Sequence, residues 1–196
     1  MHMELIGRHT HASGGARQNG HDDQARFARV VLPHLADAYA LARWLTGNET
    51  DAEDVVQDAC LRAFRAIAGF REGNARAWLL TIVRNTAYTW LGKNRSPALV
   101  VTDDPEEVEG VNVGSDSERP DSMIIAASDA ARLRAQIEKL PTPFRETLVL
   151  RDLQGLDYKQ IGKVTGVPIG TVMSRLARAR RRLMAMLAKD EKNAAA

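Results

Sequence analysis

The chain is poor in cysteine and in long apolar runs, and both shortages limit what it can be. Cys60 is the single cysteine among 196 residues, so an intrachain disulfide and a CxxC zinc site are excluded. No stretch reaches the ~18 apolar residues that a membrane span needs. Residues 1–23 lack the apolar core of a secretory signal. We therefore expect a chain that works in the reducing cytoplasm, with no membrane insertion of its own.

The usual signatures of an enzyme are also missing. The sequence has no phosphate-binding loop and no nucleophile beside a general base. Four histidines fall in the N-terminal tail at spacings that do not suit a metal site: His2, His9, His11 and His21. We expect no catalytic residue, no cofactor and no bound metal.

The chain lacks an excess of one charge, because 27 Lys and Arg stand against 25 Asp and Glu, giving a formal net charge of +2. The balance is uneven along the sequence. Residues 25–95 hold 10 basic and 7 acidic side chains, residues 96–127 hold 1 and 8, and residues 128–196 hold 14 and 7. Two basic segments thus flank an acidic one, and blocks of this kind indicate charged partners rather than a particular fold.

The apolar content of 44% and the charged content of 27% are ordinary for a soluble globular protein. The length allows one domain or two small ones. The acidic segment has Pro and Gly among its Asp and Glu and few residues that could build a core. We predict an all-α chain of two small helical domains joined by a flexible acidic linker. Its expected parts are a disordered N-terminal tail (1–24), a first domain (25–95), the linker (96–127), a second domain (128–188) and a C-terminal tail (189–196).

Three helices are predicted in the first domain, over residues 23–46, 50–67 and 74–93. Pro33 should kink or divide the first of them. Thr50 and Glu53 have the spacing of a capping box at the start of the second. The side of this second helix away from its apolar stripe carries Asp51, Asp54, Gln57 and Asp58. Taken alone, such an acidic row is most simply a solvated face.

The second domain has the pattern of a helix-turn-helix. Helices are predicted over residues 128–140 and 142–153, followed by a short helix over 158–164 that Asp157 and Gln160 should cap. A tight turn centred on Gly166 then leads into a long helix over 168–188. The polar side of this last helix carries Thr171, Ser174, Arg175, Arg178, Arg181 and Arg182.

The side chains of this polar face favour DNA binding over a solvent-exposed surface without a partner. Hydroxyls and an Arg fork near the start of the helix can meet base edges in the major groove. The Arg cluster further along can meet phosphates, which adds affinity without sequence preference. A solvated basic helix in an ordinary bundle is the alternative, but it leaves the one-sided Arg and the Gly turn unexplained.

Together, the motifs of the two domains resemble a bacterial RNA polymerase sigma factor of the extracytoplasmic function type, group IV of the sigma-70 family. DAEDVVQD at residues 51–58 looks like region 2.2 of that family. FREGN at 70–74, AWL at 77–79 and RNT at 84–86 look like regions 2.3 and 2.4. GTV at 170–172 and SRLARAR at 174–180 are similar to region 4. The resemblance covers about residues 25–95 and 128–187, so the tails and the linker lie outside it.

The resemblance implies a role for each motif. Asp51, Asp54, Gln57 and Asp58 would bind the clamp helices of the polymerase β′ subunit, and the second domain would meet the β flap. The −10 promoter element would be bound by Gly73, Asn74, Ala75, Arg76, Arg84, Asn85 and Tyr88. The −35 element would be bound by Pro168, Thr171, Ser174, Arg175, Arg178, Arg181 and Arg182. An anti-sigma factor would hold the protein inactive, and the linker would run towards the RNA exit path.

One residue departs from the family pattern, and two other functions stay open. Many family members have Lys or Arg where this chain has Met173, so the −35 preference is expected to be unusual. The first alternative is a sigma-like decoy that sequesters an anti-sigma factor without reading DNA. The second is a stand-alone helix-turn-helix regulator, which would leave the motifs of the first domain without a purpose.

Overall fold

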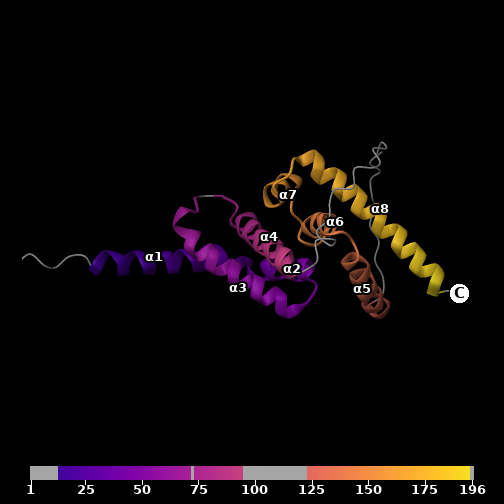
Figure 1. Ribbon diagram of the computed structural model, residues 1–196, viewed down its shortest axis with the longest axis horizontal. Helices are drawn as coiled ribbons and strands as arrows, with labels where there is room; N and C mark the ends of the chain where they lie inside the picture. The colour runs from indigo at the N-terminus through magenta and orange to yellow at the C-terminus, as the bar shows by residue number, and fades with distance from the viewer. Residues whose placement is uncertain (1–12, 72, 95–122, 195–196) are drawn as a thin grey trace, which may run out of the picture.

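The computed structural model describes residues 13–71, 73–94 and 123–194, and within them the chain is helical and has no strand (Figure 1). The helices are α1 (Ser13–Val31), α2 (Leu35–Thr46), α3 (Glu49–Ala66), α4 (Ala75–Asn94), α5 (Met123–Glu138), α6 (Thr142–Leu148), α7 (Tyr158–Thr165) and α8 (Ile169–Ala194). Short 3₁₀ turns η1 (Leu32–His34) and η2 (Ile67–Gly69) follow α1 and α3, and a π-helical turn η4 (Val149–Leu153) extends α6. The predicted all-α, two-domain architecture is confirmed.

Helices α1 to α4 form the first domain, in which α2, α3 and α4 pack on one another. Their apolar stripes meet in a core whose largest fully buried members include Leu41, Leu45, Val55, Leu79 and Val83. Burying one such side chain stabilises a fold by roughly 1.5–3 kcal/mol. The core therefore fixes α3 and α4 side by side, with their polar faces turned outward.

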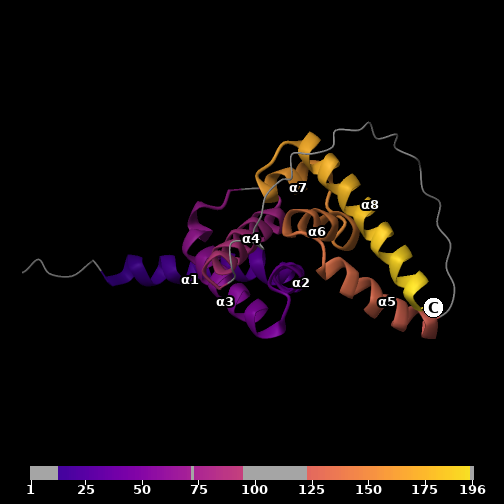
Figure 2. The same ribbon diagram turned by 45° about the vertical axis from the view of Figure 1, so that its right-hand side comes forward.

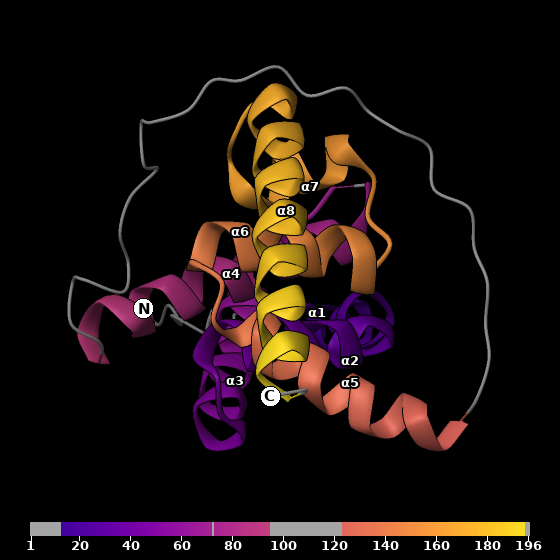
Figure 3. The same ribbon diagram turned by 90° about the vertical axis from the view of Figure 1, so that its right-hand side faces the viewer.

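Helices α5 to α8 form the second domain. The long helix α8 packs along α6, contacts α7 and α5, and crosses the front of α6 in the view of Figure 3. The buried core here includes Leu150, Ile161 and Val172. At the far end, Arg132 of α5 and Asp190 of α8 form an ion pair of 3.0 Å that holds these two helices together.

Local capping signals explain several of the helix ends. Gly47 ends α2 with φ +89°, a left-handed conformation that favours glycine. Asp157 and Gln160 form the predicted capping box at the start of α7. At α3 the structure differs from the prediction: Asn48, rather than Thr50, caps the helix by accepting a hydrogen bond from the Asp51 N–H. Asparagine is among the best N-caps, so the cap lies two residues earlier than predicted.

Two other boundaries differ from the sequence reading. Residues 13–24, predicted to be a disordered tail, form the first part of α1. Extending a helix from a packed segment costs little, because the costly step is nucleation. Helix α5 likewise begins at Met123, inside the predicted linker, while residues 96–122 of that linker lie outside the described residues. Pro33 lies in η1 and divides α1 from α2, as predicted.

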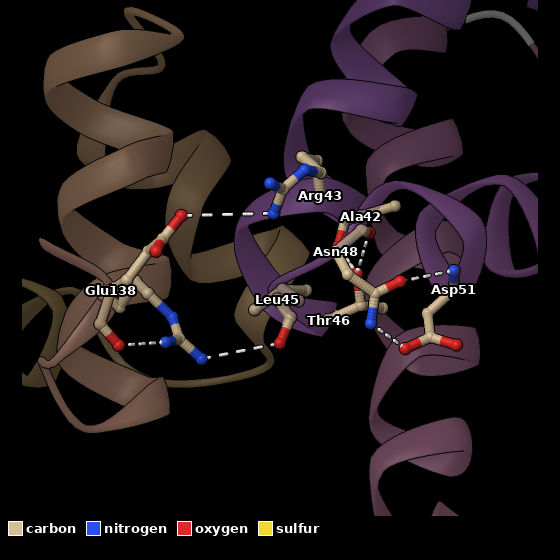
Figure 4. A network of polar contacts seen from close by, with 8 residues as sticks. Ala42, Arg43, Leu45, Thr46, Asn48, Asp51 and Glu138 are labelled. Atoms are coloured by element: carbon tan, nitrogen blue, oxygen red, sulfur yellow. Dashed lines mark hydrogen bonds and ion pairs between the residues drawn. The ribbon is translucent and has the colours of Figure 1, made fainter. Parts of the chain in front are cut away.

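The two domains pack against each other. α7 contacts α4, and α6 contacts α2; Figure 2 shows these pairs meeting between the domains. Arg43 of α2 forms an ion pair of 4.0 Å with Glu138 of α5 at one edge of this interface (Figure 4). At the same edge, Arg145 donates to the carbonyl oxygen of Leu45 at 3.4 Å.

Candidate nucleic-acid interface

Two glycines shape the turn between α7 and α8. Gly166 ends α7 with φ +73°, in the left-handed region that other residues rarely adopt. Gly162 lies within α7, where an added Cβ would come within 3.0 Å of the Val167 carbonyl oxygen. The turn can therefore fold back tightly on its own helix. With Ile161 and Val172 buried beneath it, the pair has the predicted helix-turn-helix form.

The face of α8 that points away from this core carries most of the predicted −35 residues. Arg175 is the exception, because its Nε atom is buried and its charge opposes the rise that burial causes in the pKa of the Glu146 carboxyl group. Pro168, Ser174, Arg181 and Arg182 are exposed, and Thr171, Arg175 and Arg178 are half-buried. Met173 is 48% exposed and Ile169 47% exposed on the same stretch. Two apolar side chains therefore lie among the polar ones near the start of the helix. The guanidinium of Arg182 lies 4.8 Å from the centre of the Phe144 ring, a cation–π contact that also steadies it.

The predicted −10 residues of α4 do not all face solvent. Arg84 Nε lies 2.6 Å from Oε1 of Glu146, and the Tyr88 hydroxyl donates to Oε2 of the same carboxylate at 3.1 Å. The Arg84 guanidinium also stacks over the Tyr88 ring at 4.3 Å. Asn85, one residue along, is exposed and accepts a hydrogen bond from Arg84 at 3.3 Å. The second domain thus holds Arg84 and Tyr88, and leaves Asn85 exposed.

Glu146 was not singled out by any sequence pattern, yet its side chain is fully buried. Burial raises the pKa of its carboxyl group, and the Arg84 guanidinium opposes that shift. Burial also raises the pKa of the Tyr88 phenol, with the Glu146 charge adding to the effect. Removing one partner of a buried ion pair typically costs about 3–5 kcal/mol, because the other charge is left uncompensated. The three side chains therefore act as one unit.

The loop before α4 places its predicted residues in two environments. Gly73 and Asn74 are exposed, and Asn74 Oδ1 accepts a hydrogen bond of 2.9 Å from the Ala77 N–H. Arg76 is bound on two sides. Its guanidinium forms an ion pair of 2.7 Å with Asp37 of α2 and donates to the Gln154 carbonyl oxygen of the second domain at 2.8 Å.

A cavity of about 410 Å³ opens beside this loop. Its lining combines Gly73 and Ala75 with the ring of Phe70 and two cationic side chains of α1, Arg26 and Arg29. Arg26 also donates to the Phe70 carbonyl oxygen. The two arginines were missed by sequence reasoning, because they precede the loop by more than forty residues and belong to no motif.

The acidic row on α3 is accessible. Asp54 and Gln57 are exposed, while Asp51 and Asp58 are half-buried. Asp58 pairs with Arg62 at 2.9 Å, and Asp51 binds the Asn48 amide at the helix start. A cavity of about 240 Å³ lies between α3 and α4 next to this row, lined by Asp54, Val55, Asp58, Arg62, Thr86, Thr89, Trp90 and Lys93.

No described helix is long and apolar enough to cross a membrane. Within residues 13–71, 73–94 and 123–194, no three potential ligand side chains converge as a metal site would require. The four histidines of the N-terminal tail lie outside the side chains that the structure describes.

Two family models match the chain. The model for sigma-70 region 2 matches residues 30–96, and the model for sigma-70 region 4 matches residues 130–183. These ranges include the acidic row of α3, the predicted −10 residues of α4 and the predicted −35 residues of α8.

Related proteins and solved structures point to the same family as the two family models. The chain is 34% identical over 85% of its length to the ECF RNA polymerase sigma factor SigE of Mycolicibacterium smegmatis, and spans 63% of that relative. It is 33% identical over 81% of its length to the RNA polymerase sigma-H factor of Pseudomonas aeruginosa, spanning 84% of it. Among solved structures, the sigma factor RpoE of Bartonella quintana, in complex with the anti-sigma factor NepR, matches with a TM-score of 0.62. That match has 30% identity and covers 83% of this chain and 96% of that one.

Proposed function

Because this chain belongs to the extracytoplasmic function (ECF) RNA polymerase sigma factors, we propose that it binds core polymerase and directs it to start transcription at a specific set of promoters. In this role it is a specificity subunit rather than an enzyme. It works with polymerase in the cytoplasm. Residues 25–95 form the domain for polymerase and the −10 element, and residues 128–188 the domain for the −35 element, joined by the acidic linker 96–127.

Each proposed surface uses chemistry that fits its partner. The acidic row Asp51, Asp54, Gln57 and Asp58 binds the β′ clamp helices. The exposed face of α8, from Pro168 to Arg182, reads the −35 element and contacts its phosphates. The loop Gly73–Arg76 and the α4 residues Arg84, Asn85 and Tyr88 bind the separated strand of the −10 element, where rings stack and guanidinium groups meet phosphates.

One observation supports this function above others: an acidic face on α3 and two DNA-type faces, on α4 and α8, occur in one chain. A helix-turn-helix regulator needs only the last of them. A decoy has no use for the arginines of α8, since an interaction protein that never meets DNA gains nothing from phosphate contacts.

We also infer control by an anti-sigma factor. The support is the likeness to RpoE, which was solved with the anti-sigma factor NepR, and to CnrH, solved with the cytosolic domain of CnrY. The CnrH match has a TM-score of 0.59 and 29% identity.

Reconstitution tests the proposal. Purified protein and core polymerase are passed together over a sizing column, and the complex then transcribes a library of genomic fragments. A sigma factor co-elutes with core and yields discrete run-off products. A decoy yields none, and a stand-alone regulator binds duplex fragments tightly without polymerase and fails to co-elute. Either of these outcomes overturns the proposal.

A further inference from the structure

The exposed surface at the start of α8 is largely apolar. Ile169 is 47% exposed and Met173 is 48% exposed. The two residues lie four positions apart, so their side chains are neighbours on one face of the helix. Both lie in the first two turns, the part of a recognition helix whose side chains meet base edges in the major groove. The part of α8 that we expect to come closest to the bases therefore presents hydrocarbon and thioether surface.

The polar side chains beside this apolar pair are less well placed to read a base by hydrogen bonds. Ser174 uses its hydroxyl hydrogen within the helix, donating to the Thr171 carbonyl oxygen at 3.0 Å, so it offers a base only an acceptor. The Nε atom of Arg175 is buried. Arg178 lies about 7.5 Å further along the helix than Met173. Base readout by the first two turns of α8 therefore depends largely on apolar contacts.

Gly170, between the two apolar side chains, leaves room for a partner to approach. A Cβ added there would meet nothing within 4 Å among the described residues outside its own stretch of helix, so internal packing does not require glycine at this position. Glycine weakens a helix relative to alanine, and it is used where a ligand must approach the backbone closely. The surface between Ile169 and Met173 thus has the shape of a contact site.

The charge around the apolar pair indicates the kind of partner. Residues 168–189 hold six Lys and Arg and no Asp or Glu, and Arg181 and Arg182 are exposed further along the same helix. A partner that fits this surface has negative charges on either side of an apolar group. Duplex DNA has that arrangement, because phosphates border the major groove and the C5-methyl group of thymine projects into it.

We propose that Ile169 and Met173 read thymine in the −35 element by packing against its C5-methyl group in the major groove. The inference rests on the proposed function and adds a base preference to it: at the base pair that Met173 meets, A·T is favoured over G·C. Methionine suits this contact, because its flexible and polarisable thioether adapts to the shape of an irregular surface.

The test replaces thymine by deoxyuridine, which keeps the base pairing and lacks only the methyl group. Each thymine on either strand of a −35 element mapped in the reconstitution is replaced in turn. Core polymerase reconstituted with the full chain then chooses between the replaced promoter and the natural one, which carry run-off products of different length. The ratio of the two products measures the preference for the methyl group. Both templates compete for the same polymerase, so the ratio does not depend on how tightly a variant binds core.

We expect the parent protein to prefer thymine about fourfold at one or two positions, the factor that corresponds to burying one methyl-sized group. Met173→Ala should bring the ratio close to one at one of these positions, and Ile169→Ala at the other. Met184→Ala is the matched control, because Met184 is 67% exposed on the same helix but about 16 Å beyond Met173; it should keep the parent's ratio. Met173→Arg should replace the preference for A·T by one for G·C, since a guanidinium donates to guanine.

The outcomes separate the methyl contact from the function. If polymerase initiates normally but no thymine shows a ratio that depends on Met173 or Ile169, the methyl contact is wrong and the sigma function stands. A −35 element in which the promoters share no A·T pair has the same meaning.

If reconstitution yields no transcripts, the sigma function is wrong, and deoxyuridine is placed instead in the duplex fragments that the protein binds without polymerase. A preference for thymine that Met173→Ala abolishes in those fragments supports the methyl contact in a stand-alone regulator. Its absence there, or a failure to bind any duplex, overturns the methyl contact as well.

Discussion

Among single side chains, Arg178 is the one that we expect to discriminate most between bases. It follows Thr171 and Ser174 by roughly one to two helical turns on the polar face of α8, and a guanidinium can donate two parallel hydrogen bonds to guanine. Met173, where related proteins often carry a cation, is 48% exposed on the same helix and offers an apolar contact instead. Sequence preference at the −35 element should therefore depend heavily on the remaining arginines.

Arg178→Ala should weaken −35-dependent transcription by about 1–3 kcal/mol and relax the base preference at one position. Competition between wild-type and single-base-changed promoters measures both effects. Lys189→Ala is the control, because Lys189 is an exposed cation on the same helix beyond the proposed DNA face. Equal losses for the two variants would show that Arg178 contributes only general charge.

Cys60 allows a second test at this scale, since burial raises the pKa of its thiol. The thiolate is the reactive form, and an ordinary thiol titrates near pH 8.5, so alkylation of Cys60 should rise at a higher pH than that. The rate of iodoacetamide labelling, followed by mass spectrometry from pH 7 upwards with glutathione as reference, measures this. A profile that coincides with glutathione would contradict the packing of α3.

At the scale of elements, helices whose caps and apolar period are encoded in neighbouring residues were predicted well from the sequence. The Asp157–Gln160 box, the left-handed Gly166 and the apolar period of α8 all lie within a few residues of the structure they determine. The sequence therefore predicts the helix-turn-helix well. The start of α3 was predicted less well, because Asn48 and Thr50 are both good caps two residues apart, and Asn48, the stronger cap, accepts the hydrogen bond from the Asp51 N–H.

Asp157→Ala removes the side chain that accepts from the Gln160 N–H at 2.7 Å. We expect it to lower the free energy of unfolding by about 1 kcal/mol, the usual cost of losing a cap. Urea denaturation followed by circular dichroism gives the value. Lys159→Ala changes an exposed residue of the same helix and should lower the free energy of unfolding much less. If both variants lose the same free energy, the cap is not formed in solution.

The acidic row of α3 makes a separate prediction. Asp54→Lys should weaken binding to core polymerase while leaving the thermal midpoint nearly unchanged, because the side chain is exposed. Glu53→Lys is a matched charge reversal one residue away, about 100° around the helix. Titration of labelled protein with core polymerase compares the two. If Asp54→Lys binds as tightly as Glu53→Lys, the contact with the β′ subunit lies elsewhere.

At the scale of the whole molecule, the formal net charge of +2 conceals domains with different tasks. The charge blocks could be located from the sequence, and they indicated where DNA should bind. What could not be foreseen is how the domains meet. Arg84 and Glu146 are 62 residues apart, and no periodicity or motif links them, so only the folded chain reveals that they form an ion pair between the domains. The same holds for Arg26 and Arg29 at the cavity beside Gly73.

The most direct test of the central claim is to map, by sequencing 5′ ends, the transcripts that core polymerase makes from a genomic library with and without this protein. We predict a small set of new start sites, each preceded by two shared sequence elements at a fixed spacing. That spacing reflects the two domains, each bound at its own element. Start sites that are identical with and without the protein, or that share no upstream elements, would contradict its assignment as a sigma factor.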